Sequence, residues 1–221
     1  MRKFLLATLM LFTAVTMAQD QDDNRLTIPK GTWVLGGNIG FFSNTSDNNF
    51  TDDIVRNTER SSFTFSPRIG YAFSDNWTVG LVSDYFVQKG DNENIAPDGT
   101  ISNGETKSES LSFAPYVRRY FGINKNLAFF AQGEVGISKA WSESTNTGLD
   151  RSTSEQDGVF MNLRPGLIFF PTKNLAFETS IALLRYSAFD REDSSGTISE
   201  DRSFSFDLNT TNLLFGVSYF F

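Results

Sequence analysis

Six ionisable residues are the first candidates for chemistry in this sequence of 221 residues. Three arginines and three carboxylates alternate along the chain, in the order Arg68, Asp84, Arg118, Glu134, Arg164 and Glu178. In an enclosed interior they would form ion pairs, because buried charges are costly unless they are paired and hydrogen-bonded. In an open interior they would line a narrow, charged path. The choice between the two depends on the elements that position them.

The residue types that are missing narrow the chemistry further. The sequence contains no histidine and no cysteine, which removes the commonest general base, the commonest zinc ligand and every thiol nucleophile. It also lacks the G-x-S-x-G motif of serine hydrolases. A mechanism that uses carboxylates alone stays open, but each carboxylate has a candidate arginine partner that would keep it ionised. We therefore predict a protein that is not an enzyme and has no catalytic residues and no cofactor.

The charge balance is acidic. With 26 Asp and Glu against 19 Lys and Arg, the formal net charge is −7, whereas a nucleic-acid-binding protein would carry a basic stripe. Asp52-Asp53 and the run Asp190-Arg191-Glu192-Asp193 offer hard oxygen ligands to Ca²⁺. Neither has the regular spacing of a calcium loop, so we favour solvated acidic segments and predict no metal site.

Beyond Lys30 the chain alternates with a period of two. From Phe63 to Phe73, apolar or aromatic residues fill the odd positions, and polar or small residues fill the even ones. Successive side chains of a strand point to opposite faces, so this pattern predicts strands with two different faces and an all-β fold. Eight segments show it: 33–41, 63–73, 77–88, 111–121, 127–141, 161–169, 175–183 and 211–221.

The connections between these segments are short and long in turn. The short links, 74–76, 122–126 and 171–174, are rich in turn residues, and the sequence around them recurs from one link to the next. The long ones are polar, hold most of the acidic residues and are predicted to be loops, at 44–60, 89–108, 142–157 and 190–203. This arrangement is typical of a single eight-stranded antiparallel up-and-down barrel that spans a membrane.

The aromatic residues indicate which face is outside. They cluster at both ends of the strands, for example Trp33 and Trp77 near the short links and Phe41 and Trp141 near the long ones. Two aromatic bands around an aliphatic middle fit a membrane barrel better than a soluble barrel with an apolar interior. The six ionisable residues then have the inward parity. Because eight strands leave just enough room for side chains, we predict an ion-pair network that plugs the lumen, with a gated path as the alternative.

The last strand carries a resemblance to a known family. Phe215, Val217, Tyr219 and Phe221 share the outward parity, and an alternating C-terminal strand that ends in Phe resembles the assembly signal of bacterial outer-membrane proteins. The whole chain resembles the small OmpX-type and OmpA N-terminal-type barrels. The resemblance implies a place in the bacterial outer membrane, among lipid and lipopolysaccharide, and insertion by the barrel assembly machinery.

The first residues fit export to that membrane. Arg2 and Lys3 precede an apolar run that ends at Val15, and small residues follow up to Ala18. This is the pattern of a signal peptide, and the run is too short to span a bilayer as a helix. We therefore expect a signal peptide at 1–18, a short periplasmic N-terminal segment at 19–30 and the outer-membrane barrel domain at 31–221.

The function is less defined than the fold. Lys139 and Arg185 have the outward parity near the long loops, where they would contact lipopolysaccharide phosphates or extend along the membrane interface. We predict a non-catalytic barrel with a structural or surface-interaction role, which presents four long acidic extracellular loops to an unidentified extracellular ligand. The alternative is a narrow channel or a small-molecule transporter that resembles the OmpW type.

Overall fold

A computed structural model describes residues 25–50, 54–95, 100–148, 151–193, 196–206 and 213–221 of the chain. Within these ranges the regular elements are all strands, and no helix there is long and apolar enough to cross a membrane. The signal peptide predicted at 1–18 lies outside the described residues. The strands are β1 (Trp33–Phe50), β2 (Ile54–Ser74), β3 (Trp77–Ile95), β4 (Ile101–Gly122), β5 (Leu127–Asn146), β6 (Ser152–Phe169), β7 (Leu175–Ser180), β8 (Leu184–Asp193), β9 (Ile198–Phe206) and β10 (Leu214–Phe220).

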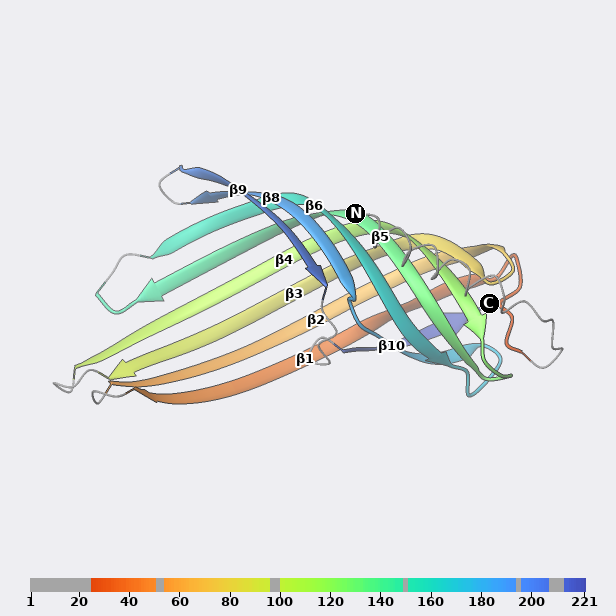
Figure 1. Cartoon of the computed structure of the whole chain (residues 1–221), viewed down its shortest axis with the longest axis horizontal. Coiled ribbons are helices and arrows are strands. Elements are labelled where there is room, and N and C mark those ends of the chain that lie inside the picture. Colours follow the sequence, from red (N-terminus) through yellow and green to blue (C-terminus); the bar gives the residue numbers. More distant parts are fainter. Residues whose placement is uncertain (1–24, 51–53, 96–99, 149–150, 194–195, 207–212) are drawn as a thin grey trace, which may run out of the picture.

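Eight of these strands close into a ring. β1 to β6 pair in sequence order, β6 pairs with β7, β7 with β10 and β10 with β1, and all these pairings are antiparallel. At the closure, the N–H of Trp33 donates to the carbonyl of Phe221 (2.7 Å), and the carbonyl of Trp33 accepts a hydrogen bond from the N–H of Phe221 (3.0 Å). The ring lies at the right-hand end of Figure 1, where β10 and the C-terminus are found. The predicted eight-stranded up-and-down barrel is confirmed.

The short links tie neighbouring hairpins together. The carbonyl of Asn126 accepts the N–H of Phe170, and that of Asn174 accepts the N–H of Phe220, both at 2.7 Å. The side-chain amides of the same two asparagines donate to the carbonyls of the same two phenylalanines (2.7 and 2.6 Å). The first link makes the same backbone contact one hairpin earlier. The sequence that recurs at the links therefore makes the same contact at each of them. We call the end of the barrel where these links lie the short-link end.

The two faces of the strands differ as the alternation predicts. On the outer face Leu35 and Ile39 are each 56% exposed. On the inner face Val34, Ala72 and Ala128 are fully buried. The outer apolar side chains form the band that faces lipid in a membrane barrel.

The four predicted long loops are wrong, because most of their residues continue the strands. β1 runs to Phe50 and β2 begins at Ile54; β3 runs to Ile95 and β4 begins at Ile101. The segments 142–157 and 190–203 are also mostly strand. Hydrophobic alternation marks a strand only where its two faces meet different surroundings. Outside the membrane both faces of these hairpins meet water, and backbone ladder hydrogen bonds hold them instead.

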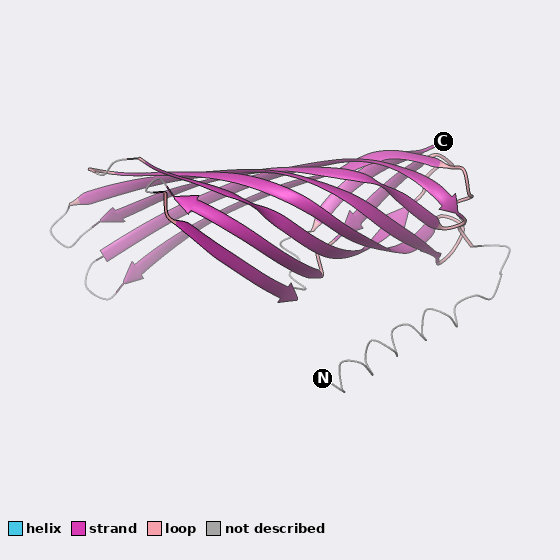
Figure 2. Cartoon of the chain, turned by 90° about the horizontal axis from the view of Figure 1, so that it is seen from above, coloured by secondary structure: helices cyan, strands magenta, loops and turns pink. Residues whose placement is uncertain are grey.

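The strands therefore extend far past the membrane. β4 has 22 residues, which at about 3.4 Å per residue make it roughly 70 Å long, whereas the apolar band of a membrane barrel is about 25 Å tall. In Figure 1 the outer parts of β1 to β6 extend leftward from the ring, and Figure 2 shows the same extension from above. We call these outer parts, with β8 and β9, the outer hairpins.

A β-bulge ends the seventh predicted strand, 175–183, at Ser180, and β8 follows beyond it from Leu184. Gly166 of β6 pairs with Ser180 of β7, whereas Leu163 of β6 pairs with Leu184 of β8. Three residue steps along β6 thus lie opposite four residue steps from the end of β7 to the start of β8. One extra residue therefore lies within 181–183. A one-residue slip exchanges the two faces of a strand. Each side chain of β8 therefore lies on the face opposite to the one that the alternation of β7, continued along the chain, would predict.

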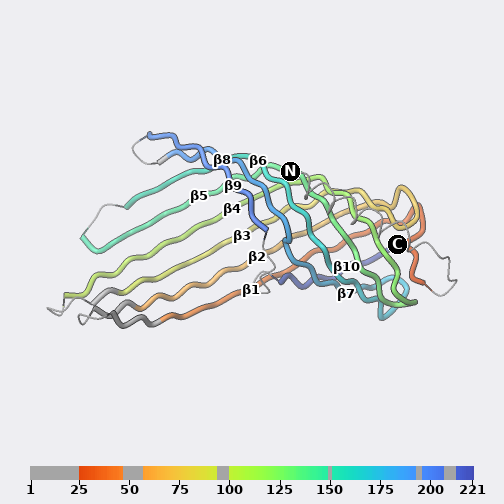
Figure 3. The backbone as a smooth tube through the Cα atoms, in the orientation of Figure 1, coloured from red at the N-terminus to blue at the C-terminus, as the bar shows by residue number. Residues whose placement is uncertain are grey.

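β9 lies outside the eighth predicted strand, 211–221, and mostly within the predicted loop 190–203, and the described outer hairpins form an open sheet. β10 pairs with β1 only from Val34 to Ile39, and β9 pairs only with β8 among the described strands. Beyond Ile39, β1 and β9 are the two edges of this sheet. Figure 1 and the tube in Figure 3 show β1 along its lower edge and β9 along its upper edge. We call the line between these edges, across which no two described strands pair, the seam.

Candidate functional site

A buried carboxylate near the short-link end joins two of the predicted arginines. Glu178 of β7 is paired with Arg68 of β2, and its Oε2 lies 2.6 Å from Nη1 of Arg118 on β4. The Ser218 hydroxyl on β10 accepts a hydrogen bond from Arg68 (2.9 Å) and donates one to Glu178 (3.3 Å). All four residues are at most 4% exposed. Their even positions point inward on four different strands, which is why the ring brings them together.

A second cluster lies nearer the outer hairpins. Nε of Arg164 on β6 lies 3.0 Å from Glu134 of β5, and Nη2 lies 3.7 Å from Asp84 of β3. The Asn162 amide donates to Glu134 (3.1 Å), and the Ser112 hydroxyl donates to Asp84 (3.3 Å). Glu134 is buried, but the side chains of Arg164 and Asp84 are 14% and 18% exposed. This cluster therefore forms a boundary between the filled interior and open space.

Gln132 connects the two clusters. Its side-chain carbonyl accepts a hydrogen bond from Nε of Arg118, and its amide donates to Glu134, both at 2.6 Å. The register of β4, β5 and β6 sets Gln132 opposite both Arg118 and Arg164. All six charged residues named from the sequence thus belong to one connected set of contacts, which we call the lumen network.

Four members of the lumen network were not predicted: Ser112, Gln132, Asn162 and Ser218. They are neutral, so no charge singled them out, although their even positions share the inward parity of the charged residues. That parity, applied to buried amides and hydroxyls, is the signal that could have found them. Their contribution is to complete the hydrogen bonds of buried charges, without which such charges are strongly destabilising.

An aromatic layer fills the barrel between the lumen network and the short links. Tyr120, Phe130, Phe170 and Phe220 are all at most 3% exposed and pack with ring centroids 4.8–6.3 Å apart. The guanidinium carbon of Arg118 lies 3.9 Å from the centroid of Phe130, so a cation–π contact joins the layer to the network. The charges and the aromatic rings therefore form one continuous packed interior.

The segment before β1 packs against the same layer. Ile28 is 3% exposed within this cluster, and Leu26 packs beside it. The N–H of Ile28 donates to Oδ1 of Asn76 (2.9 Å), and the N–H of Leu26 donates to the carbonyl of Asn124 (2.8 Å). Two links thus hold this segment at the short-link end, where it packs beneath the aromatic layer.

On its other side the lumen network faces a cavity of about 600 Å³, which we call the vestibule. Asp84, Asn162 and Arg164 line it together with many hydroxyl side chains. The hydroxyl residues include Ser62, Thr64, Ser66, Ser110 and Ser112. Gly40 to Phe42 of β1, together with Leu213 and Leu214, line the part next to the seam. The volume is within the range of small-molecule sites.

Arg185 does not have the outward position that its parity predicted. It lies opposite Asn162 in the register of β6 and β8, and it lines the vestibule. Ser187, two residues further, is 4% exposed, whereas Tyr186 between them is 43% exposed. The bulge at 181–183 is the reason, because it exchanges the faces of all residues that follow it in β8.

Lys139 is exposed on the outer face, as its parity predicted. Its ammonium group lies 2.9 Å from Glu155 of β6 and 5.7 Å from the centroid of Trp141. Contact of Lys139 with lipopolysaccharide stays a prediction. On β10 and at its end, the outward positions Phe215, Val217, Tyr219 and Phe221 are 48–63% exposed, and their role as an assembly signal also stays a prediction.

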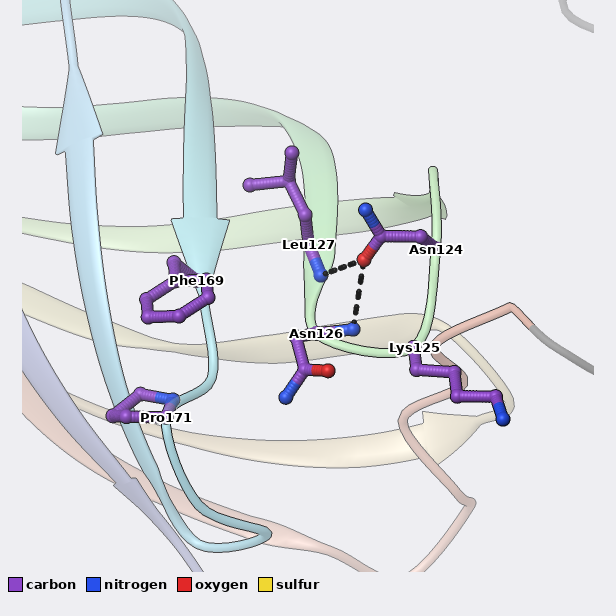
Figure 4. A pocket seen from close by; sticks show the side chains of 6 residues that line it. All are labelled: Asn124, Lys125, Asn126, Leu127, Phe169 and Pro171. Atoms are coloured by element: carbon purple, nitrogen blue, oxygen red, sulfur yellow. Dashed lines mark hydrogen bonds between the residues drawn. The ribbon is translucent and has the colours of Figure 1, made fainter.

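A second hollow lies at the link between β4 and β5, drawn in Figure 4. Oδ1 of Asn124 accepts the N–H groups of Asn126 and Leu127, both at 2.9 Å. Phe169 and Pro171 stand on the side opposite Asn124, and Lys125 points away from them. The polar groups there are used to hold the turn, so we regard this hollow as structural.

The candidate calcium positions are only partly described. Asp52-Asp53 lies outside the described residues. Among the residues that the structure describes, no group of three or more His, Cys, Asp and Glu side chains is arranged to hold a metal ion.

No protein of curated function matches the chain. Among solved structures, it is similar to the outer membrane protein OprG of Pseudomonas aeruginosa, with 14% identity over 87% of this chain and 97% of that one and a TM-score of 0.48. It is also similar to Ail, the attachment invasion locus protein of Yersinia pestis, with 18% identity over 87% and 99% and a TM-score of 0.33.

The family comparison covers nearly the whole sequence. Residues 4–221 match the family described as outer membrane protein beta-barrel domain. The match agrees with the closed ring of eight antiparallel strands and its outward apolar band. The chain therefore belongs to the outer membrane protein β-barrel domain family and is a protein of the bacterial outer membrane.

Proposed function

We propose that this protein is a non-catalytic, non-conducting barrel that carries its outer hairpins beyond the membrane as surfaces for interaction. The observation that supports it most is the continuous filling of the short-link half, which is the periplasmic half in outer-membrane barrels. Arg118 is 2% exposed between Glu178 and the Phe130 ring, and Ile28 closes the layer beneath. An ion would have to displace paired, desolvated charges to pass.

The carboxylates of the lumen network are poor candidates for catalysis. Glu178 is held by two arginines, and Glu134 by Arg164 and two amides. A general acid or base must exchange a proton near neutral pH, whereas arginine partners favour the charged carboxylate. With no histidine or cysteine in the chain, these contacts support a structural role for the charges.

The outer hairpins have the properties of a presented surface. Every described residue of β9 is exposed. Lys107 and Glu109 of β4 pair at 2.8 Å, and Arg202 and Glu200 of β9 pair at 3.2 Å, with side chains that are 35–71% exposed. Exposed pairs of this kind add little stability. Their charges instead set the field that an approaching partner meets, which in this acidic chain favours a cationic one.

Conductance in a planar bilayer tests the sealed interior. We expect no stable openings from the refolded protein, with insertion verified by its heat-dependent migration in SDS gels. The double variant Tyr120→Ala/Phe130→Ala, which empties the aromatic layer, should open a leak. Phe113→Ala/Phe129→Ala removes two outward-facing rings and is the matched control. Stable discrete openings of the unaltered protein would reject the sealed barrel and support the channel alternative.

Shortening a hairpin tests the second half of the proposal. Replacing residues 89–108 with a short turn removes the outer parts of β3 and β4 but leaves the ring pairings of both strands. We expect the shortened protein to insert and to keep its heat-dependent migration. Loss of the folded form would mean that these hairpins are needed for the barrel itself rather than presented by it.

A further inference from the structure

The vestibule contains more positive charge than the lumen network can neutralise. Four arginines and three carboxylates belong to the network or line the vestibule: Arg68, Arg118, Arg164 and Arg185 against Asp84, Glu134 and Glu178. Each of the first three arginines is paired with a carboxylate of this set. The excess charge therefore belongs to Arg185, which the bulge turns inward.

Arg185 is free to bind something else. No hydrogen bond or ion pair joins its guanidinium to another described residue, and it is exposed to the vestibule that it lines. The nearest carboxylates, Asp84 and Glu134, are already held by Arg164. A guanidinium in a cavity, with its donors unused, is suited to a carboxylate or phosphate, which it can bind with two parallel hydrogen bonds.

Two residues that line the same cavity each have a buried polar atom without a partner in the described part of the chain. Oδ1 of Asn162 and Oγ of Ser66 have no hydrogen-bond partner among the described residues, although these residues are only 4% and 2% exposed. Asn162 donates its amide to Glu134, which leaves its carbonyl oxygen as an unused acceptor. Asn162 and Arg185 lie opposite each other in the register of β6 and β8, and both line the vestibule. Buried polar atoms without partners are rare and call for an explanation.

We propose that the vestibule is a binding site for a small anion that carries hydroxyl groups, of the sugar-acid class. Arg185 binds its carboxylate, and Asn162 accepts a hydrogen bond from a neighbouring hydroxyl. Ser66 and the other hydroxyl side chains of the wall contact the remaining hydroxyls. The volume of about 600 Å³ accommodates a molecule of this size. The ligand enters from the outside, since the other end is sealed.

Titration of the full, detergent-refolded protein with D-glucuronate tests the proposal, by calorimetry or by NMR shifts. We expect saturable binding, and glucose, which has the hydroxyls but no charge, should bind at least tenfold more weakly. Acetate, which has the charge but no hydroxyls, should also bind more weakly. Equal binding of glucuronate and glucose, or no saturable binding of glucuronate, overturns the proposal without any variant.

Substitution assigns the binding to Arg185. Arg185→Gln should weaken glucuronate binding at least tenfold, because it removes the charge and the paired donors, and Arg185→Lys should restore part of it. Lys139→Gln removes a cation from the outer face and is the matched control, with no expected effect. Unchanged binding in Arg185→Gln refutes the site.

The proposed binding site depends on the proposed function in one respect only: the sealed periplasmic half sets the side from which the ligand enters. Glucuronate binding is measured without a membrane potential, and conductance is measured without glucuronate. A conducting protein that binds glucuronate through Arg185 would therefore reject the seal and keep the site. A protein that does not conduct and does not bind glucuronate would keep the seal and reject the site.

Discussion

The lumen network and the outer hairpins use the same charged residue types in opposite ways. Arg118 and Glu178 are paired at 2.6 Å, with side chains at most 2% exposed. Lys107 and Glu109 are paired at 2.8 Å, with side chains 49% and 35% exposed. The geometry is similar but the surroundings differ. Breaking a desolvated pair leaves an uncompensated charge, whereas breaking a solvated one returns two ions to water. The distance between the charged groups alone therefore does not show which pair contributes more to stability.

The largest effect is expected from Glu178→Ala. It leaves both Arg68 and Arg118 without a carboxylate in the buried cluster, and breaking a buried pair from one side costs about 3–5 kcal/mol. Urea unfolding of the refolded barrel in detergent measures the change. Glu200→Ala, which breaks an exposed pair of β9, is the matched control. Equal unfolding midpoints for the two variants would erase the contrast between the two regions.

A smaller effect is expected from Arg164→Ala. Its main partner Glu134 keeps hydrogen bonds from Gln132 and Asn162, and Asp84 is partly exposed. The loss should therefore be about 1.5–3 kcal/mol, the range for hydrogen bonds to charged groups. The same urea titration measures it. A loss as large as that of Glu178→Ala would show that the boundary of the vestibule is as dry as the cluster below.

Hydrogen exchange sharpens the comparison without a substitution. Thr106 of β4 lies opposite Gly90 and Ser144 in the two flanking ladders, so its amide should exchange more slowly than that of Lys125 in the exposed link. It should still exchange faster than the amide of Arg118, because the outer hairpins have few buried contacts to resist local opening. Exchange of Thr106 as fast as that of Lys125 would support a loop there instead of a strand.

The smallest effect is expected from the Lys107–Glu109 pair. The hydrogen bond from Lys107 lowers the pKa of Glu109 below its usual value. A carboxyl with a lowered folded pKa adds stability that is present above its unfolded pKa and is lost as the pH falls through the folded pKa. Both groups are solvated, so Glu109→Gln should leave the melting temperature at pH 7 within error of the unaltered protein. A clear drop at pH 7 that vanishes at acidic pH would show that the outer pairs also stabilise the fold.

The sequence predicted the ring well and the outer hairpins poorly, for one physical reason. From Phe63 to Phe73 one face meets lipid and the other meets the interior, so the alternation marks a strand. From Lys89 to Glu93 the chain is also strand, but it has no apolar side chain on either face, so no alternation remains. Its ladder depends on backbone groups, which are the same for every sequence.

Membership in the lumen network could be predicted, but the pairing within it could not. The inward parity identified Arg68 and Glu178 as interior residues. Their contact spans 110 residues of sequence and exists only because the ring brings β2 and β7 to the same level. Gln132 shows the same limit, since its value lies in bridging Arg118 and Glu134 rather than in its own chemistry.

By itself the sequence determined the number of ring strands, the outward face and the charged residues that lie in the lumen. These follow from the side-chain alternation, which is local and is imposed by the contrast between lipid and interior. Only the tertiary structure decided how far the hairpins extend, which charges meet, and that Arg185 faces the vestibule. The last depends on one extra residue within 181–183, which appears only when β7 and β8 are laid against the same neighbour. Register belongs to a pair of strands, and one strand's sequence does not contain it.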